Sequence, residues 1–413
     1  MNQVKKELVP KLRFPEFKKD GDWEEKKLGE IADYENGKAH EQDISDHGKY
    51  LVVNSKFIST EGGVRKFTNE GHCLAEKGEI LMVLSDVPNG RAIAKCFLID
   101  ESNKYTVNQR ICRIKPRENV SGFIFCILNR NEFYLNFDDG VKQTNLRRED
   151  VLDCPIFLPT KKEQTRISDC LSSLDELIEA EDQKLEALQR HKKGLMQELF
   201  PVNGETLTKL RFKEFEKDGE WEEIILSDVL TEHKLKNDGK SKVHSVSVHK
   251  GIIDQIEHLG RSFASSDTSK YNLVKPFDIV YTKSPTGDFP FGIIKQSRLD
   301  YNVIVSPLYG VFSPKNKYLG YILNCYFESP IRTKNYLDPI TQKGAKNTIQ
   351  ISNDTFISRG LYLPEDEIEQ QKIADCLSSI DNLITNQTKK LESLRLHKKG
   401  LMQQLFPNFS EAQ

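Results

Sequence analysis

One segment with a helical pattern occurs twice in the sequence. "HKKGLMQELFP" at 191–201 returns as "HKKGLMQQLFP" at 397–407, and over 163–201 against 369–407 the two copies share 25 of 39 residues. A second segment, 11–32, returns as 209–230 with 13 of 22 residues identical. The blocks between these copies, 33–160 and 231–365, barely resemble each other. The chain is therefore a duplicated frame that carries two different inserts.

The duplicated helical segments carry a heptad pattern. Apolar residues recur at alternating steps of four and three, which predicts an a/d seam over most of five heptads. Polar residues Glu181, Lys192, Gln387 and Lys398 fill the gaps in the pattern. The predicted seam residues are Ile167, Leu171, Leu174, Ile178, Leu185, Leu188, Leu195, Leu199, Ile373, Leu377, Ile380, Ile384, Leu391, Leu394, Leu401 and Leu405. Two equal seams in one chain can bury each other, which favours an intramolecular coiled coil over two separate amphipathic helices.

Connectivity predicts the direction of this pairing. Each insert precedes its own helix, and the second frame begins soon after the first helix ends. An insert that lies at the start of one helix and the end of the other requires antiparallel helices. At about 1.5 Å per residue, the helices would hold the inserts roughly 55 Å apart.

The predicted fold is mixed α/β, with two α/β domains, an antiparallel intramolecular coiled coil and a pseudo-two-fold internal repeat. The segments are a flexible tail at 1–10, a first domain at 11–160, a helix at 161–201, a linker at 202–208, a second domain at 209–366, a helix at 367–407 and a flexible tail at 408–413.

Both inserts contain matching strands, at 77–85 and 276–284, each followed by a Pro- and Gly-containing hairpin loop. Short helices are expected near 122–133 and 319–327, and last strands at 154–159 and 360–364. A loop with Gly, Lys and an amide precedes each last strand, at 140–151 and 344–355. Arg, Lys, Asn and Gln make bidentate contacts with purine edges, so these loops are candidates for nucleic-acid binding, although polar loops without such a role have the same composition. The candidate residues are Asn89, Arg91, Lys95, Asn108, Arg110, Lys142, Gln143, Asn145, Arg147, Lys283, Thr286, Lys295, Lys343, Lys346, Asn347 and Gln350.

Charge divides unequally between the inserts. Residues 229–363 hold 18 Lys and Arg against 11 Asp and Glu, a net of +7. Residues 31–150 hold 17 against 18, a net of −1. The second insert has the composition of a phosphate binder, whereas a DNA surface on the first must be local.

Other classes of function lack support in the sequence. There is no phosphate-binding loop of the GxxxxGK type, no nucleophile elbow and no Gly-rich cofactor loop, so no catalytic residue is assigned. Eight cysteines without CxxC pairing and nine histidines without HxxxH spacing predict reduced thiols and no metal site. No run approaches the roughly 20 apolar residues of a membrane span, and we expect a cytoplasmic protein.

This layout resembles the specificity subunit of type I restriction–modification enzymes. The resemblance lies in the duplicated W-E-E-x-x-L frames at 23–28 and 221–226, the two HKKGLMQ helices and the two dissimilar inserts. It implies two target recognition domains that each read one half of an asymmetric, bipartite DNA site, with the coiled coil as spacer and as docking surface for two methyltransferase subunits. It also implies two restriction or translocase subunits as partners. S-adenosylmethionine, ATP and Mg would be bound by those partners, and none by this chain.

A second interpretation stays open at this point. A scaffold whose coiled coil joins two protein-binding domains would explain the helices and the overall net charge of −2. It explains the +7 insert and the repeated Lys-amide loops less well.

Overall fold

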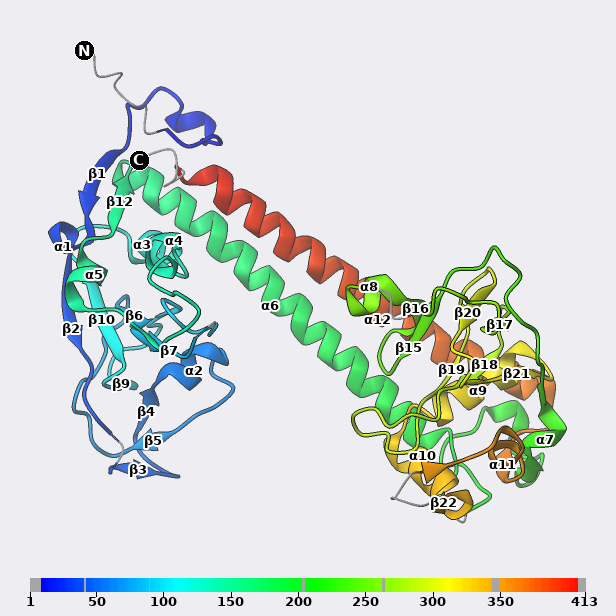
Figure 1. Cartoon of the computed structure of the whole chain (residues 1–413). Helices are drawn as coiled ribbons and strands as arrows, with labels where there is room; N and C mark the ends of the chain where they lie inside the picture. Colours follow the sequence, from blue (N-terminus) through cyan, green and yellow to red (C-terminus); the bar gives the residue numbers. More distant parts are fainter. Residues whose placement is uncertain are drawn as a thin grey trace. The chain divides into compact units, whose positions relative to one another are not determined.

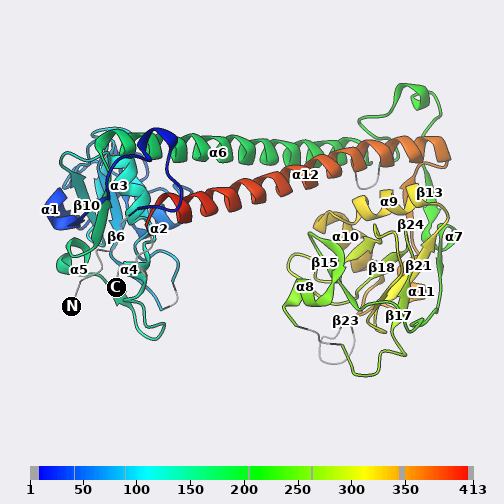
Figure 2. The same ribbon diagram turned by 90° about the horizontal axis from the view of Figure 1, so that it is seen from above.

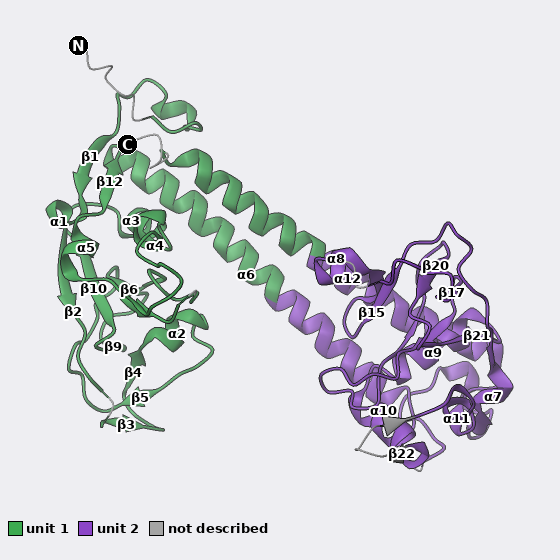
Figure 3. Cartoon of the chain, in the orientation of Figure 1, with its two compact units in different colours: residues 1–182, 389–413 green, residues 183–388 purple. Residues whose placement is uncertain are grey.

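The computed structural model describes residues 9–40, 42–88, 90–202, 205–261, 264–343 and 349–407. The chain divides into unit 1, residues 1–182 and 389–413, and unit 2, residues 183–388 (Figure 3). The two long helices, α6 (Lys161–Glu198) and α12 (Glu367–Leu405), each belong partly to one unit and partly to the other. Unit 1 therefore consists of two separate stretches of sequence, and unit 2 of a single one.

Unit 1 is built on two four-stranded sheets. The first has the order β2-β10-β6-β8, with strands β2 (Ala32–Asn36), β10 (Ile111–Pro116), β6 (Ile80–Val83) and β8 (Cys96–Leu98), all antiparallel. The second has the order β3-β5-β4-β9, with strands β3 (Ile44–Ser45), β5 (Phe67–Thr68), β4 (Tyr50–Val53) and β9 (Tyr105–Val107). Two short pairs, β1 (Glu24–Lys27) with β12 (Pro155–Leu158) and β7 (Ser85–Asp86) with β11 (Thr144–Asn145), complete the strands.

Short helices connect the strands of unit 1 and cover part of its core (Figure 1). They are η1 (Pro15–Phe17), α1 (Leu28–Ile31), α2 (Ser55–Ser59), α3 (Ser121–Leu128), α4 (Glu132–Leu135) and α5 (Arg148–Leu152). The helix α3 and the hairpin of β6 and β8 confirm two elements that the sequence predicts for the first insert.

Unit 2 repeats the main sheet with a different sequence. Its order is β14-β21-β18-β19, with strands β14 (Leu230–Glu232), β21 (Gly310–Pro314), β18 (Ile279–Tyr281) and β19 (Ile294–Gln296). The remaining pairs are β13 (Glu222–Ile225) with β24 (Gly360–Leu363), β15 (His244–Ser247) with β16 (Gly251–Asp254), β17 (Asn272–Val274) with β20 (Val303–Val305), and β22 (Gln342–Lys343) with β23 (Ile349–Gln350). The predicted strands and hairpin of the second insert are confirmed in β18, β19 and β24.

Short helices also connect the strands of unit 2. They are η2 (Lys213–Phe215), α7 (Leu226–Val229), α8 (Gln255–Leu259), α9 (Lys317–Tyr326), α10 (Pro330–Leu337), η3 (Asp338–Ile340) and α11 (Asn353–Ile357). Figure 2 shows α9 beside the first half of α12, where Asn316 Nδ2, at the N-cap of α9, donates to Gln370 Oε1 at 2.9 Å. The predicted helix near 319–327 is thus confirmed as α9.

The long helices pair antiparallel within each unit. In unit 1, Lys398 of α12 binds Asp175 of α6, and Arg395 Nη2 lies 3.2 Å from Asp182 Oδ1. In unit 2, Lys192 Nζ of α6 lies 2.7 Å from Asp381 Oδ1 of α12. Residue numbers rise along one helix as they fall along the other, which confirms the predicted antiparallel coiled coil. No helix in the described ranges is long and apolar enough to cross a membrane.

All sixteen predicted seam side chains are buried or half-buried. At the helix ends these side chains join the domain cores, because Ile167, Leu171 and Leu405 pack into the core of unit 1. Leu199, Ile373 and Leu377 pack into the core of unit 2 in the same way. Each core therefore takes apolar side chains from the start of one long helix and the end of the other.

A buried arginine–glutamate pair joins each duplicated frame to its long helix. Arg13 Nε and Nη2 donate to Glu163 Oε1 and Oε2, both at 2.8 Å. Arg211 Nε and Nη2 donate to Glu369 Oε1 and Oε2 at 2.8 and 2.9 Å. The hydrogen bond to Glu163 raises the pKa of Arg13 above its ordinary value, although burial opposes this shift. Two parallel bonds fix orientation as well as distance, so each pair sets the angle between frame and helix.

We expect Arg13→Met to destabilise unit 1 by about 3–5 kcal/mol, because it leaves the almost fully buried Glu163 carboxylate without its partner. Urea unfolding of the variant and the parent chain measures this loss. The double variant Arg13→Met/Glu163→Met removes both charges and should recover most of it. A single variant as stable as the parent would show that the pair does not hold the frame.

Candidate nucleic-acid interface

The structure joins two loops of unit 1 that lie far apart in the sequence. Strand β7 follows β6 and pairs with β11, so that Asp86 lies opposite Thr144 and Ser85 opposite Asn145. One more backbone bond, from Leu146 N to Leu84 O at 2.8 Å, extends the pairing. The predicted loops at 86–95 and 140–151 therefore form one continuous surface.

The first loop is organised by a single carboxylate. Asp86 Oδ2 accepts the backbone N–H groups of Ala92 at 2.5 Å and Ile93 at 3.1 Å, and Oδ1 accepts that of Val87 at 2.9 Å. These bonds satisfy the backbone donors of the loop, so that the side chain of Arg91 is left exposed.

The second loop is built in the same way by two aspartates. Asp138 Oδ1 accepts the N–H of Gly140 at 3.0 Å and the hydroxyl of Thr144 at 3.1 Å. Asp139 Oδ1 accepts the N–H groups of Lys142 at 3.0 Å and Val141 at 2.8 Å. The bond from Lys142 and then that from Val141 lower the pKa of Asp139 below its ordinary value. The acidic groups thus face their own loop, and the basic and amide groups face solvent.

Six of the predicted residues of unit 1 are exposed: Arg91, Arg110, Lys142, Gln143, Asn145 and Arg147. Gln143 Nε2 donates to Asn145 Oδ1 at 3.2 Å, which holds two amides side by side. The carbonyl of Arg110 accepts the N–H of Leu84 at 3.0 Å, so that Arg110 lies beside the joined loops. Amides and guanidinium groups held in this way can bind base edges and phosphates.

Two predicted residues of unit 1 are engaged within the domain. Asn108 is buried, and its side-chain oxygen accepts the N–H of Arg110 at 3.4 Å. Lys95 Nζ donates to Glu61 Oε1 at 2.9 Å. Direct DNA contact by these two side chains stays a prediction.

In unit 2, the hairpin that follows β18 carries two predicted residues. Thr286 is exposed and its backbone pairs with Phe289, with both N–H···O bonds at 3.0 Å. Lys283 is half-buried with a φ of 59°, and burial lowers its pKa below the ordinary value of lysine. Gly292 makes this backbone possible, because a Cβ there would lie 2.7 Å from Lys283 N. Lys295 is buried, and its Nζ lies 3.4 Å from Glu328 Oε1.

The other predicted residues of unit 2 lie at β22 and β23. Lys343 lies opposite Ile349 and Gln350 opposite Gln342 in this pair, of whose side chains nothing is described. Asn89 of unit 1 and Lys346 and Asn347 of unit 2 lie outside the described residues.

Sequence reasoning missed the charged groups that position these surfaces. The pairs of Arg13 with Glu163 and of Arg211 with Glu369 were not singled out, although both members recur in the duplicated segments. The sequence does contain a signal for these pairs. Their charges recur in both copies although the inserts differ, and this indicates a role in the duplicated frame. Among the described residues, no three His, Cys, Asp or Glu side chains are placed to hold a metal ion.

Comparison with known proteins bears on this architecture. The family model described as "Type I restriction modification DNA specificity domain" matches the chain twice, at residues 20–190 and 198–396. The chain belongs to the type I restriction–modification specificity subunits. Specificity subunits are non-catalytic, and DNA recognition is their role.

Two relatives of this specificity subunit extend over nearly the whole chain. The type I restriction enzyme MjaVIII specificity subunit of Methanocaldococcus jannaschii is 25% identical and covers 95% of this chain and 92% of its own length. The crystal structure of a type I restriction–modification S subunit from M. genitalium has a TM-score of 0.65 at 17% identity, and covers 97% of this chain and 100% of its own. The latter likeness supports the fold.

We expect Lys142→Ala to weaken the binding of this specificity subunit to a random-sequence DNA duplex and to lower its salt slope by about 1, because one phosphate contact is lost. Fluorescence anisotropy at several salt concentrations measures both effects. Gln143→Ala should leave this non-specific binding unchanged, since an amide carries no charge. The matched control is Lys77→Ala, an exposed lysine before the other end of β6. Equal effects of the two lysine variants would remove Lys142 from the interface.

Proposed function

We propose that residues 11–160 and 209–366 are two target recognition domains, and that each reads one half of an asymmetric, bipartite DNA site. The helices at 161–201 and 367–407 act as the spacer, with a linker at 202–208 and tails at 1–10 and 408–413. The observation that carries this proposal is the duplicated frame with two similar helices around two dissimilar inserts. Different inserts on the same frame would read different bases with the same geometry.

The joined loops of unit 1 support a base-reading role. Exposed Gln143 and Asn145 are held together, and exposed Arg91, Lys142 and Arg147 flank them. Amides recognise adenine edges and arginines recognise guanine edges, whereas lysine binds phosphate as a point charge. Half-buried Lys95 and buried Asn108 and Lys295 would act from beneath by positioning their neighbours. In unit 2, Lys283, Thr286, Lys343, Lys346, Asn347 and Gln350 complete the proposed set.

A helical spacer adds a second level of discrimination. Each mismatched base pair costs about 1–3 kcal/mol, so one small domain reads only a limited sequence. Two domains on a paired-helix spacer add their discrimination and also reject sites with the wrong gap. A flexible linker would accept a range of gaps and lose that selection.

The chain would act in the cytoplasm as part of a complex. The coiled coil would dock two methyltransferase subunits that use S-adenosylmethionine to methylate adenine at N6. Two restriction or translocase subunits would use ATP and Mg to move along DNA and cut it. This chain would bind none of these cofactors, and its contribution would be the choice of site.

The decisive experiment is to co-purify the chain with the methyltransferase subunits encoded beside it and to map the adenines that the complex methylates in genomic DNA. We expect a split motif with a constant gap, methylated on both strands. Catalytically inactive methyltransferase subunits in the same complex are the control. Co-purification with no sequence-dependent methylation would favour the protein scaffold, which the near-neutral overall charge also fits.

Shortening both helices tests the spacer. Ion pairs join residue 192 to 381 and residue 175 to 398, which aligns the heptads at 183–189 and 384–390 with each other. Deleting both heptads removes about 10.5 Å of helix, or roughly three base pairs at ~3.4 Å each. We expect the methylated motif to keep both half-sites and to have a gap shorter by about three base pairs.

A single-helix deletion, which cannot keep the seam in register, is the control for this experiment. Altered half-sites with an unchanged gap would refute the role of the helices as spacer.

A further inference from the structure

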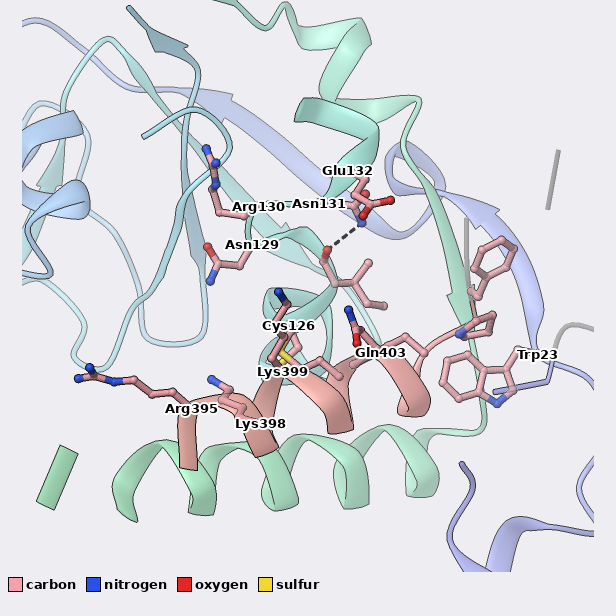
Figure 4. Close-up of a pocket in the computed structure, with 15 residues that line it drawn as sticks. Trp23, Cys126, Asn129, Arg130, Asn131, Glu132, Arg395, Lys398, Lys399 and Gln403 are labelled. Carbon is pink, nitrogen blue, oxygen red and sulfur yellow. Dashed lines mark hydrogen bonds between the residues drawn. The ribbon is translucent and has the colours of Figure 1, made fainter. Parts of the chain in front are cut away.

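Unit 1 contains a cavity of about 450 Å³, where the last turns of α12 meet the loop between α3 and α4. Its apolar wall is made by Trp23, Phe157, Met402 and Phe406. Its polar wall carries four cations, Arg130, Arg395, Lys398 and Lys399, against one carboxylate, Glu132. Figure 4 shows Arg395 and Lys398 at one end and Trp23 at the other. The cavity has room for one or two side chains of a partner, and its two ends differ in polarity.

Two of these cations have no carboxylate partner among the residues that the structure describes. Arg395 and Lys398 pair with Asp182 and Asp175 of α6. Arg130 Nη1 donates to the carbonyl of Ile93 at 3.1 Å, which leaves its charge uncompensated. Neither Arg130 nor the exposed Lys399 has an ion pair with any carboxylate in the described part of the chain. The cavity therefore favours an anion.

Unit 2 has the same helix end, and its own chain covers it. Arg332 Nη2 donates to the carbonyl of Met196 at 2.9 Å, and the guanidinium lies over the ring of Phe200, 4.9 Å from its centre. Phe200 is only 1% exposed. The matching residues in unit 1, Met402 and Phe406, are half-buried and line the open cavity. The same sequence, HKKGLMQ, is thus covered by polypeptide in one unit and open in the other.

Unit 2 also supplies a carboxylate at this place. Glu328 Oε2 lies 2.6 Å from Lys192 Nζ, and Glu328 Oε1 accepts from Asn324 Nδ2 at 3.1 Å. Burial alone would lower the pKa of Lys192, but Glu328 and then Asp381 outweigh it and raise the pKa above that of an ordinary lysine. The native partner of this helix end is therefore a glutamate side chain.

Unit 1 has the opposite charge at the corresponding position. Glu328 stands between Phe327, the C-cap of α9, and Ser329, the N-cap of α10. Arg130 stands in the same place, between the C-cap of α3 and the N-cap of α4. Lys398, the counterpart of Lys192, therefore receives no carboxylate from this junction, whereas Lys192 pairs with Glu328.

We propose that this cavity binds an acidic peptide segment of a partner protein. A glutamate or aspartate of the segment takes the place that Glu328 has in unit 2, within reach of Arg130, Lys398 and Lys399. A neighbouring apolar side chain packs on Met402 and Phe406, as Arg332 packs on Phe200. A DNA phosphate would pair with the cations but leave the apolar wall uncovered. A peptide with an acidic and an apolar side chain would cover both walls, so we favour the peptide. Because unit 2 fills its own site, each chain binds one such segment.

Trp23 provides a direct reporter, since the chain has two tryptophans and Trp221 can be replaced. In the full-length Trp221→Phe chain, we expect the blocked peptide acetyl-ELEFE-amide to change the fluorescence of Trp23 with saturation at one peptide per chain. The peptide acetyl-QLQFQ-amide, which lacks the carboxylates, should bind at least about tenfold more weakly. No change of Trp23 fluorescence at millimolar acidic peptide would overturn the proposal.

Matched variants locate the binding. Lys399→Glu should weaken the acidic peptide at least about tenfold, whereas Lys193→Glu, the same position in the other copy of HKKG, should leave its affinity unchanged. Arg130→Glu should abolish peptide binding, because it supplies the internal carboxylate of unit 2. Equal losses from Lys193→Glu and Lys399→Glu would overturn the proposal. So would displacement of the peptide by a random-sequence duplex whose own affinity depends on Lys399, since that result assigns the cavity to a phosphate.

Discussion

Both units of this protein complete their cores with side chains from the two long helices, and unit 1 takes them from two separate stretches of chain. The core of unit 1 needs Ile167 and Leu171 from the start of α6 and Leu405 from the end of α12. The core of unit 2 needs Leu199 from the end of α6 and Ile373 and Leu377 from the start of α12. Burial of these side chains is favourable only when the helices run antiparallel, so the coiled coil and the two domains form together. The remaining structure depends on this sharing.

Sharing explains why the helices are conserved between the two copies while the inserts are not. Each helix end has to fit the core of one unit, and each helix start has to fit the core of the other. The bidentate pairs of Arg13 with Glu163 and of Arg211 with Glu369 add a fixed angle between frame and helix. An insert can change freely as long as its ends meet this frame, which is the physical basis for one architecture with the two reading surfaces that we propose.

The two copies of HKKGLMQ, at the ends of α6 and α12, have different surroundings. The two copies of HKKGLMQ place Lys192 beside the carboxylates of Glu328 and Asp381, and Lys398 beside that of Asp175. The difference comes from one residue in each insert, Glu328 or Arg130, at the junction of two short helices. The inserts therefore determine the chemistry at the helix ends as well as that of the proposed DNA-binding loops.

The proposed reading surface of unit 1 depends on carboxylates that bond to the backbone of their own loops. Asp86, Asp138 and Asp139 accept the backbone N–H groups of their own loops, so that acidic side chains coexist with a surface of Arg91, Lys142 and Asn145. This arrangement explains how an insert with a net charge of −1 can present a basic local surface. Net charge describes the whole domain. Binding depends instead on which side chains stay exposed to solvent once the others bond to the backbone of their own loop.

Much of the fold followed from the sequence alone. Duplication and heptad spacing determined the frame, the seam from Ile167 to Leu405 and the antiparallel direction, because periodic burial and connectivity are local properties of a chain. Strands β6 and β18 and helices α3 and α9 could be placed from apolar runs and turn residues. Only the tertiary structure decided that β7 pairs with β11, that Asn108 and Lys295 lie inside, and that Arg130 borders an open cavity while Arg332 closes its counterpart. Those outcomes depend on contacts between residues distant in sequence, and composition and spacing carry no information about such contacts.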